Sequence, residues 1–368
     1  MTATLPPAYT IAGTAAVTAQ TKQTQGRAHG WVAHTWERRG LAAWAFWPVS
    51  QLFGLVVRLR RLLYRLGAFK THKVNVPVLL VGNAVAGGAG KTPVVLMLVA
   101  HLRTRGLRVG VISRGYGRTT TDCREVQKNS LSLDVGDEPL LIKQLNNVPV
   151  FVGQQRHLAA AALLEKYPKT QLIVGDDGLQ HLALQRDLEI CVFDQRGHGN
   201  GFMLPAGPLR EIWPRRSLFF KPWPDVPHFV VHNGSEPAGT RSYLVSRTLA
   251  PYAQSKDGLR FALSDLVNKP VIALAAIAQP ERFFDMLQEA GLVLQAQLAL
   301  PDHFDFSGWQ APLDLSGANG SVLLCTQKDA VKLWPIYPQI LAVPLVLTPE
   351  PGLMLELDLA INSLLRPA

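Results

Sequence analysis

The hydrophobic positions after Lys73 predict a fold in which strands and helices alternate. Short apolar runs, typical of buried strands, are followed by segments with helical periodicity. Strands are expected at 76–82, 107–113, 148–152, 171–174 and 188–194, and helices at 94–105, 137–145 and 158–167. Such alternation gives a parallel sheet, with functional sites at the carboxyl ends of its strands.

The pattern restarts after a proline-rich stretch at 221–227, which we interpret as a linker. A strand is expected at 228–232 and a strand–helix pair at 271–290. The chain is therefore predicted to contain two α/β domains, the first over 71–222 and a second, smaller one over 223–347. Residues 348–368 form a C-terminal segment.

The first 70 residues follow a different pattern. Residues 1–30 are rich in Thr, Ala and Gln without periodicity, and a disordered tail is expected there. They lack the basic region and apolar core of a signal peptide. Residues 41–57 carry no charge. As a helix they would span roughly 26 Å, the short end of a membrane span, and Pro48 is predicted to kink it.

Residues 55–69 have the pattern of a basic amphipathic helix. One side of this helix carries the leucines Leu55, Leu59, Leu62, Leu63 and Leu66. The opposite side carries the arginines Arg58, Arg61 and Arg65. Four tryptophans precede the helix: Trp31, Trp36, Trp44 and Trp47. Such a helix suits an anionic membrane surface, with its arginines toward the cytoplasm. Residues 31–70 are therefore predicted to be membrane-associated, either crossing the bilayer or lying in its interface. The alternative is a helix packed on the protein's own core.

Charge is concentrated in the same region. The chain has 368 residues and a formal net charge of +10, of which +9 falls before Val76. A nucleic-acid-binding protein usually spreads its basic residues over a folded face, whereas the body of this chain is close to neutral. We therefore expect a membrane as partner and no nucleic acid.

The three cysteines, Cys123, Cys191 and Cys325, lie far apart in the sequence. This spacing argues against a disulfide scaffold and against a zinc site made of cysteines alone.

The segment GNAVAGGAGKTP, at 82–93, follows the first predicted strand and opens a helix. This is the arrangement of a P-loop, whose backbone N–H groups surround phosphate oxygens. Lys91 would reach the β- and γ-phosphates, and the Thr92 hydroxyl would bind Mg²⁺. Val85 stands where the strict pattern has glycine, so the loop is a variant. The residues expected to bind the nucleotide are Gly87, Gly88, Ala89, Gly90, Lys91 and Thr92. The fold class is thus α/β with a P-loop NTPase-like core.

Asp176 and Asp177 end an apolar strand, where a P-loop enzyme keeps its second Mg²⁺-binding carboxylate. The alternative is an aspartate pair that caps a turn. Guanine specificity has no support, because the segment TQKD at 326–329 has the wrong spacing and no D-x-x-G follows the aspartate pair. The expected cofactors are therefore ATP and Mg²⁺.

Eight short motifs occur in an order that resembles one known family. They are GNAVAGGAGKTP, ISRGYGR at 112–118, GDEPLLI at 136–142, DDGLQH at 176–181, LPAGPLRE at 204–211, QPERFF at 279–284, PDHFDF at 301–306 and TQKDAVK at 326–332. Over residues 41–347 the chain resembles the tetraacyldisaccharide 4′-kinases, the lipid A 4′-kinases of Gram-negative bacteria.

The resemblance implies a reaction and a location. The γ-phosphate of ATP would pass to the 4′-hydroxyl of a tetraacylated glucosamine disaccharide 1-phosphate, giving lipid IVA in lipopolysaccharide biosynthesis. This acceptor is a lipid of the bacterial inner membrane with its sugar at the cytoplasmic face. The enzyme is thus expected there as a peripheral or single-span protein, with its catalytic domains in the cytoplasm and as a monomer.

The resemblance also implies roles for individual residues. Asp137 of GDEP matches the family's proposed general base, and His303 of PDHFDF matches a histidine that pairs with it. A carboxylate oriented by a histidine can accept the proton of an attacking hydroxyl. Asp176 and Asp177 match the carboxylates that handle Mg²⁺, with Glu138 assisting them.

Other motif residues are expected around the nucleotide and the acceptor. Gln180 and His181 match residues on the nucleotide side. Arg114, Tyr116 and Arg210 stand at the arginine and tyrosine positions of their motifs. An arginine there would offset charge on the transferred phosphoryl group, or it would hold the 1-phosphate of the lipid.

Three positions depart from the family pattern. Ala276 and Ala278 stand where the family commonly has glycines, and Gln327 replaces its glutamate. All three lie in the second half of the chain, and the catalytic motifs are intact.

Two other classes of function compete with the kinase. A membrane-bound ATPase switch would combine a variant P-loop with an amphipathic helix, but it needs neither Asp137 nor His303. A nucleic-acid-binding ATPase would bind DNA in a salt-sensitive way, which the neutral body of the chain does not support. In the kinase, we expect ATP binding to close the cleft between the domains and to bring Asp137 to His303. The alternative is a preformed pair.

Overall fold

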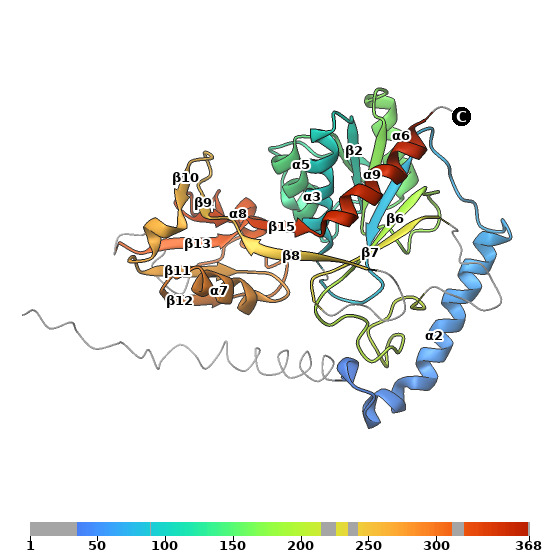
Figure 1. Ribbon diagram of the computed structural model, residues 1–368, viewed down its shortest axis with the longest axis horizontal. Helices are drawn as coiled ribbons and strands as arrows, with labels where there is room; N and C mark the ends of the chain where they lie inside the picture. Colours follow the sequence, from blue (N-terminus) through green and yellow to red (C-terminus); the bar gives the residue numbers. More distant parts are fainter. Residues whose placement is uncertain (1–34, 89, 215–225, 235–241, 311–319, 367–368) are drawn as a thin grey trace, which may run out of the picture.

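The computed structural model describes residues 35–88, 90–214, 226–234, 242–310 and 320–366. The predicted disordered tail, Ala89 and most of the predicted linker lie outside these ranges. The described chain forms two α/β domains and one long helix beside the first of them (Figure 1).

A nine-stranded sheet forms the first domain, in the order β15-β8-β7-β6-β1-β5-β2-β4-β3. Its strands are β1 (Val78–Gly82), β2 (Val109–Ser113), β3 (Arg124–Glu125), β4 (Val150–Val152), β5 (Leu172–Asp176), β6 (Leu188–Phe193), β7 (His228–His232), β8 (Tyr243–Leu249) and β15 (Leu345–Pro349). Neighbours from β4 to β8 pair in parallel, whereas β3 and β15 are antiparallel edges. This topology confirms the predicted parallel α/β core.

The central strands are buried along their whole length because helices cover both faces of the sheet. Alternate residues point to two separate cores. Leu79 and Val81 pack with α3 (Lys91–Thr104), α5 (Asp137–Asn146) and α9 (Pro351–Leu365). Val78 and Leu80 pack on the other face with α6 (Arg156–Lys166). The one-turn helix α4 (Ser132–Val135) precedes α5. The loops at the carboxyl ends of the strands are left to form a site.

A six-stranded sheet forms the second domain, in the order β10-β9-β14-β13-β11-β12. Its elements are β9 (Tyr252–Gln254), β10 (Arg260–Ala262), η1 (Leu263–Leu266), β11 (Val271–Ala275), α7 (Pro280–Glu289), β12 (Leu294–Ala299), β13 (Val322–Thr326), α8 (Gln327–Leu333) and β14 (Leu341–Val343). The four strands from β14 to β12 are parallel. Helix α7 covers one face of this sheet, and α8 with Phe306 covers the other.

The domain boundary differs from the one expected at 222–223. β7 and β8 extend the first sheet, and β15 returns to pair with β8 before α9 packs on the first core. The second domain therefore begins after β8 and ends before β15, and these two strands connect the domains (Figure 1). The apolar pattern at 228–232 marks a strand, but only its parallel pairing with β6 decides to which sheet it belongs.

Helix α2 (Leu41–Arg65) is a single helix of 25 residues that continues across Pro48. It lies beside the first domain (Figure 1). Its buried residues, Ala43, Ser50 and Gly54, are small, whereas its large apolar residues are exposed: Leu41, Trp44, Trp47, Val49, Leu52, Leu55, Val56, Leu59 and Leu62. This exposure does not fit a helix packed in the protein's own core. Among the described helices, α2 is the one long and apolar enough to cross a membrane.

Candidate active site

The predicted P-loop connects β1 to α3. Gly87 and Gly90 adopt positive φ angles of 98° and 74°, a region that favours glycine. The guanidinium of Arg247 on β8 packs close to Gly90, since a Cβ there would lie 2.0 Å from it and the arginine would have to shift. Lys91 and the following residues form the first turn of α3, whose N–H groups favour anions. The loop therefore has the backbone geometry for binding phosphate.

Val85, the departure from the strict P-loop pattern, anchors this loop. Its side chain is buried, and the residue forms an antiparallel bridge with Leu209 of the LPAGPLRE motif. Backbone hydrogen bonds of 2.8 Å join Ala86 to Pro208 and Arg210 to Ala84. A glycine at position 85 would lose this apolar contact.

The acidic pair lies at the carboxyl end of β5, the strand next to β1: Asp176 is its last residue and Asp177 follows it. The parallel register places Asp176 beside Val81, one residue before the P-loop segment begins. Asp177 follows in a left-handed conformation with φ 49°. Its Oδ1 lies 3.6 Å from Lys91 Nζ and 3.9 Å from Arg210 Nη1. The structure thus brings together four of the predicted site residues and the buried side chain of Thr92.

The carboxylate of Asp176 fits a divalent cation. It is fully buried, and neither oxygen has a hydrogen-bond partner among the described residues. Burial and, after it, the nearby carboxylate of Glu138 raise its pKa to about 8, against the opposing charge of Lys91. A hard cation would satisfy these oxygens and keep the group ionised. In the described parts of the chain no three His, Cys, Asp or Glu side chains form a metal cluster. Mg²⁺, which uses one or two carboxylates plus substrate phosphates, does not require one.

Arg156, which no sequence motif predicts as a site residue, holds the acidic turn in place. Its Nη2 donates hydrogen bonds to the carbonyl oxygens of Asp177 (2.8 Å) and Asp176 (3.4 Å). The side chain is buried at the start of α6, and this burial lowers its pKa although both aspartates act in the opposite direction. A buried arginine that bonds to backbone has no sequence signature apart from its place at a helix start.

The predicted catalytic pair is formed across the two domains. Asp137 lies in the first turn of α5, and its Oδ2 is 3.1 Å from Nδ1 of His303. Lys332 Nζ of α8 lies 2.9 Å from the same oxygen. His303 has a φ of 59°, a strained conformation for a residue other than glycine. The pair is thus already in contact, as the preformed alternative requires, and a more open state without ATP stays a prediction.

The hydrogen bonds define the protonation of the pair. Lys328 Nζ lies 3.2 Å from His303 Nε2. Because an ammonium group only donates, Nε2 accepts, and Nδ1 carries the hydrogen that is donated to Asp137. Burial raises the pKa of Asp137, but the hydrogen bond from His303 and the charge of Lys332 outweigh it, so the pKa lies below its ordinary value. Asp137 is therefore an ionised carboxylate at neutral pH.

Two lysines of the TQKDAVK motif were not selected from the sequence. Lys328 contacts Asp302 and His303, and Lys332 contacts Asp137. Their spacing of four residues on one helix face is the signal that could have identified them. The buried Asp329 between them fixes α8, since its Oδ2 accepts hydrogen bonds from Thr326 Oγ1 (2.7 Å) and from the backbone of Ala276 (2.9 Å).

Residues around this pair include further predicted positions. The ring of Tyr116 lies 5.4 Å from that of His303 and is 67% exposed. Arg114 is also exposed, in the loop after β2. Ala278 faces the P-loop, because a Cβ on Gly88 would lie 3.1 Å from that of Ala278. Nothing in the structure explains Gln327.

Gln180 and His181 lie behind the P-loop and the acidic turn. Gln180 Nε2 donates to the carbonyl of Asn83 (2.9 Å) and to Glu211 Oε1 (3.0 Å). His181 Nε2 accepts from the backbone N–H of Arg156 at 3.3 Å. Burial and the charge of Arg156 lower the pKa of His181 to about 4, so its imidazole is neutral. The contacts of both side chains are with the protein framework.

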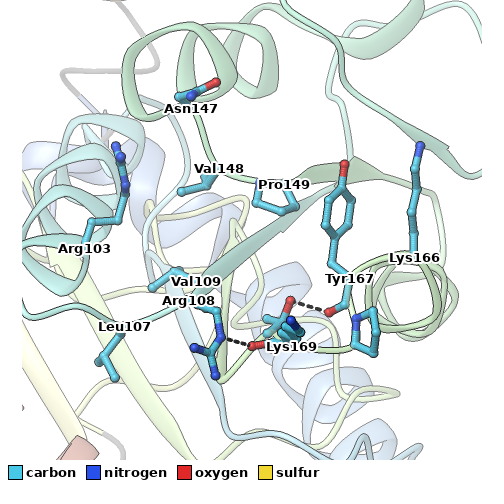
Figure 2. A pocket seen from close by; sticks show the side chains of 12 residues that line it. Arg103, Leu107, Arg108, Val109, Asn147, Val148, Pro149, Lys166, Tyr167 and Lys169 are labelled. Carbon is cyan, nitrogen blue, oxygen red and sulfur yellow. Dashed lines mark hydrogen bonds between the residues drawn. The ribbon is translucent and has the colours of Figure 1, made fainter.

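A separate cavity of about 490 Å³ lies at the opposite edge of the sheet, beside the amino ends of β2, β4 and β5. Figure 2 shows its basic side chains, among them Arg103 and Arg108. Both donate hydrogen bonds to backbone carbonyls, at Asn146 and Lys169. None of the predicted site residues lines this cavity.

A P-loop, an acidic pair on the adjacent strand and a carboxylate–histidine pair close to them define an ATP-dependent phosphotransferase of the P-loop class. The family described as Tetraacyldisaccharide-1-P 4′-kinase matches residues 42–362 of the chain. The chain belongs to this family.

Individual relatives agree with this assignment. The chain is 51% identical to the tetraacyldisaccharide 4′-kinase of Acidovorax sp. (strain JS42), over 89% of this chain and 94% of that one. It is 52% identical to the enzyme of Verminephrobacter eiseniae (strain EF01-2), over 88% and 73%. Among solved structures, the "apo" form of LpxK from Aquifex aeolicus in complex with ATP matches with a TM-score of 0.73 and 27% identity, over 88% and 99%. A kinase, not a nucleotide switch, is therefore the function class.

Proposed function

We propose that this kinase transfers the γ-phosphate of ATP to the 4′-hydroxyl of a tetraacylated glucosamine disaccharide 1-phosphate, which gives lipid IVA in lipid A biosynthesis. Membership of the tetraacyldisaccharide-1-P 4′-kinase family supports the reaction. The observation that carries the mechanism is the hydrogen-bonded pair of Asp137 and His303, held close to the P-loop by two domains.

The P-loop and the acidic turn would hold ATP and Mg²⁺. The backbone of 87–90 and the Lys91 ammonium would bind the phosphates, and Thr92, Asp176 and Asp177 would bind the ion with Glu138 nearby. The ion would neutralise negative charge on the phosphates during transfer. The unpartnered buried carboxylate of Asp176 supports this assignment.

Asp137 would act as the general base. It accepts the proton of the 4′-hydroxyl as the new bond from that oxygen to the γ-phosphorus forms. The bond from the γ-phosphorus to the bridging oxygen breaks at the same time, and ADP leaves with that electron pair. His303 donates to Asp137 and orients it, and Lys332 keeps it ionised. Because its lowered pKa keeps this carboxylate ionised at neutral pH, it is available to accept the proton.

Of the three motif residues Arg114, Tyr116 and Arg210, one is assigned to ATP and the other two to the acceptor. Arg210 lies 3.9 Å from Asp177, beside the P-loop, and would offset charge on the transferred phosphoryl group. Tyr116 lies against His303 and is exposed, so it would contact the sugar of the acceptor. Arg114, exposed after β2, would hold an anionic group of the acceptor.

The exposed apolar face of α2 would place the enzyme at its substrate. Its leucines and tryptophans suit the acyl region of a bilayer, and its arginines suit anionic headgroups. We assign the protein to the bacterial inner membrane, peripheral or single-span, with both catalytic domains in the cytoplasm.

Transfer of labelled γ-phosphate from ATP to a tetraacyl disaccharide 1-phosphate in detergent micelles tests this function. A labelled lipid that carries the phosphate at the 4′ position and requires Mg²⁺ is the expected result. Steady release of inorganic phosphate without any labelled lipid would contradict it.

A further inference from the structure

Helix α2 packs against a loop of the first domain, residues 199–211. Ser50 Oγ donates to the carbonyl of Met203 (2.6 Å) and accepts from the backbone N–H of Ala206 (3.0 Å). One turn further, a Cβ on Gly54 would lie 3.2 Å from the sulfur of Met203. The small residues of α2 therefore let the loop approach the helix closely, and they fix the loop to it.

The same loop is joined to the P-loop. Its residues 208–210 pair with 84–86 through two backbone hydrogen bonds and the Val85–Leu209 bridge. One segment of chain thus contacts the membrane-associated helix on one side and the phosphate-binding loop on the other. A shift of α2 would move a direct partner of the P-loop.

A chain of side chains runs along the same path. Arg61 of α2 pairs with Glu211, whose Oε1 accepts from Gln180 Nε2 at 3.0 Å. Gln180 Nε2 also donates to the carbonyl of Asn83 at 2.9 Å, and Asn83 Nδ2 donates to the carbonyl of Gly87 at 3.2 Å. Four residues, the first of them on α2 itself, therefore lead from the helix to Gly87 of the P-loop.

The burial along this path distinguishes Arg61 from the other arginines of α2. Arg58, Arg60 and Arg65 are exposed, whereas Arg61 is 22% exposed and its partner Glu211 only 1%. A carboxylate so deeply buried needs its partner, because an unpaired charge in that position is strongly destabilising. Such a pair contributes more to fixing the position of Glu211 relative to α2 than to the stability of the fold, as expected for a positioning residue.

We propose that Glu211 and Gln180 are positioning residues that couple the seating of α2 on a lipid surface to the shape of the P-loop, so that an anionic lipid surface tightens ATP binding. This inference rests on the proposed ATP binding and membrane association of the enzyme. Coupling of this kind is reciprocal, so ATP tightens vesicle binding by the same factor. The affinity of the enzyme for ATP would then stay low until the enzyme binds the membrane that contains its acceptor.

The test measures the dissociation constant of a fluorescent ATP analogue on the full-length chain. It compares protein without lipid and protein with vesicles of phosphatidylethanolamine and phosphatidylglycerol that contain no glycolipid acceptor. The wild type should bind the analogue about tenfold more tightly with vesicles, within the usual range of coupling between sites. Glu211→Gln should bind it equally with and without vesicles.

A matched control separates positioning from loss of stability. Glu125 is also a carboxylate in an ion pair, with Lys166, and its side chain is only 8% exposed. It lies on β3, away from both α2 and the P-loop. Glu125→Gln should lower the melting temperature as Glu211→Gln does but keep the vesicle effect. Arg61→Gln should also reduce the effect of vesicles on nucleotide affinity, because it removes the partner of Glu211. The double variant Arg61→Gln/Glu211→Gln should show no smaller vesicle effect than Glu211→Gln alone, since both substitutions interrupt the same path.

The outcomes are distinct. Nucleotide binding that does not respond to vesicles in the wild type, or that responds equally in Glu211→Gln, would overturn the coupling while leaving the kinase intact. Additive effects of the two substitutions would overturn the path through Arg61. A chain that does not bind the nucleotide under any condition would overturn the proposed function itself.

Discussion

Asp137 receives two hydrogen bonds on one oxygen, and both donors come from the other domain. His303 and Lys332 both contact Oδ2, at 3.1 Å and 2.9 Å. In the proposed mechanism, the other oxygen accepts the proton of the acceptor's hydroxyl. The second domain would thus orient the proposed base, which belongs to the first domain, and keep it ionised. Separating the two domains would remove both effects.

Replacing Lys332 should change the pH dependence of the reaction. Because the charge and the hydrogen bond of Lys332 lower the pKa of Asp137, Lys332→Met should raise that pKa. If Asp137 must be ionised to act as the base, the acid limb of kcat/KM should move to higher pH. Kinetics over a pH series measure this shift. The exposed Lys269→Met should leave the limb in place, and an unmoved limb in Lys332→Met would disprove the assignment.

The sequence predicts some site residues and not others. Lys91 and Thr92 belong to a motif whose spacing predicts phosphate and Mg²⁺ binding, and the structure places them in the first turn of α3. The pairing of Asp137 with His303 was inferred from family resemblance, since no local pattern links residues 166 positions apart. Arg156 was missed because its role depends on which carbonyls lie beside it in the fold.

The start of α5 is built around a glycine. Gly136 precedes Asp137 with φ 90° and ψ 151°, a region accessible almost only to glycine. A Cβ there would lie 3.0 Å from the backbone of Gly115 and Tyr116. The close contact of two loops thus positions both the base and the neighbouring tyrosine.

Gly136→Ala should disturb this arrangement. The strained backbone alone should cost about 1–3 kcal/mol in the free energy of unfolding, and displacement of Asp137 should lower kcat more than the affinity for ATP. Gly106→Ala offers a control, since Gly106 also has a positive φ of 78° but no atom within 4 Å of a Cβ. Denaturant unfolding and steady-state kinetics measure both effects. Equal losses of stability and kcat in the two variants would contradict the argument.

Helix α2 carries a prediction about the membrane. Leu52 and Leu59 are 63% and 52% exposed on its apolar face. Replacing both by Glu removes two apolar side chains, each worth about 1.5–3 kcal/mol when buried, and adds like charge toward an anionic surface. Sedimentation with phosphatidylglycerol vesicles should fall at least tenfold while the melting temperature is kept. A variant that still sediments fully would show that another surface binds the lipid.

The helices and strands of the first domain were predictable because both faces of the sheet are covered. Full burial produces continuous apolar runs such as 78–82, which are easily recognised. The assignment of β7 and β8 to the first sheet was not predictable, because their residues fit a strand in either domain. Only the parallel pairing with β6 decides it.

Residues of both domains meet at the candidate active site. Within the described ranges of the chain, β8 and β15 lead from the sheet of the first domain to that of the second. Contacts across the interface include Asp137 with Lys332 and Gly88 with Ala278. Such a connection allows the domains to open by a hinge motion without unfolding either sheet.

Small-angle scattering tests the predicted closure. The radius of gyration should decrease when a non-hydrolysable ATP analogue with Mg²⁺ is added, because the phosphates add contacts between the P-loop and the second domain. The same protein with Lys91→Ala should compact less. No change on binding of the analogue would show that the Asp137–His303 pair is preformed and that closure is not part of the cycle.

The most direct test of the central claim compares Asp137→Asn with the wild type. The affinity for ATP is measured by nucleotide binding, and kcat by transfer of labelled γ-phosphate to the tetraacyl disaccharide 1-phosphate. If Asp137 is the general base, kcat falls by about 10²–10⁴-fold while the dissociation constant for ATP stays within about threefold, since Asn keeps the shape but loses the basic oxygen. If kcat is retained and ATP binding weakens instead, Asp137 is a binding residue, and the catalytic pair across the two domains is not the base of this kinase.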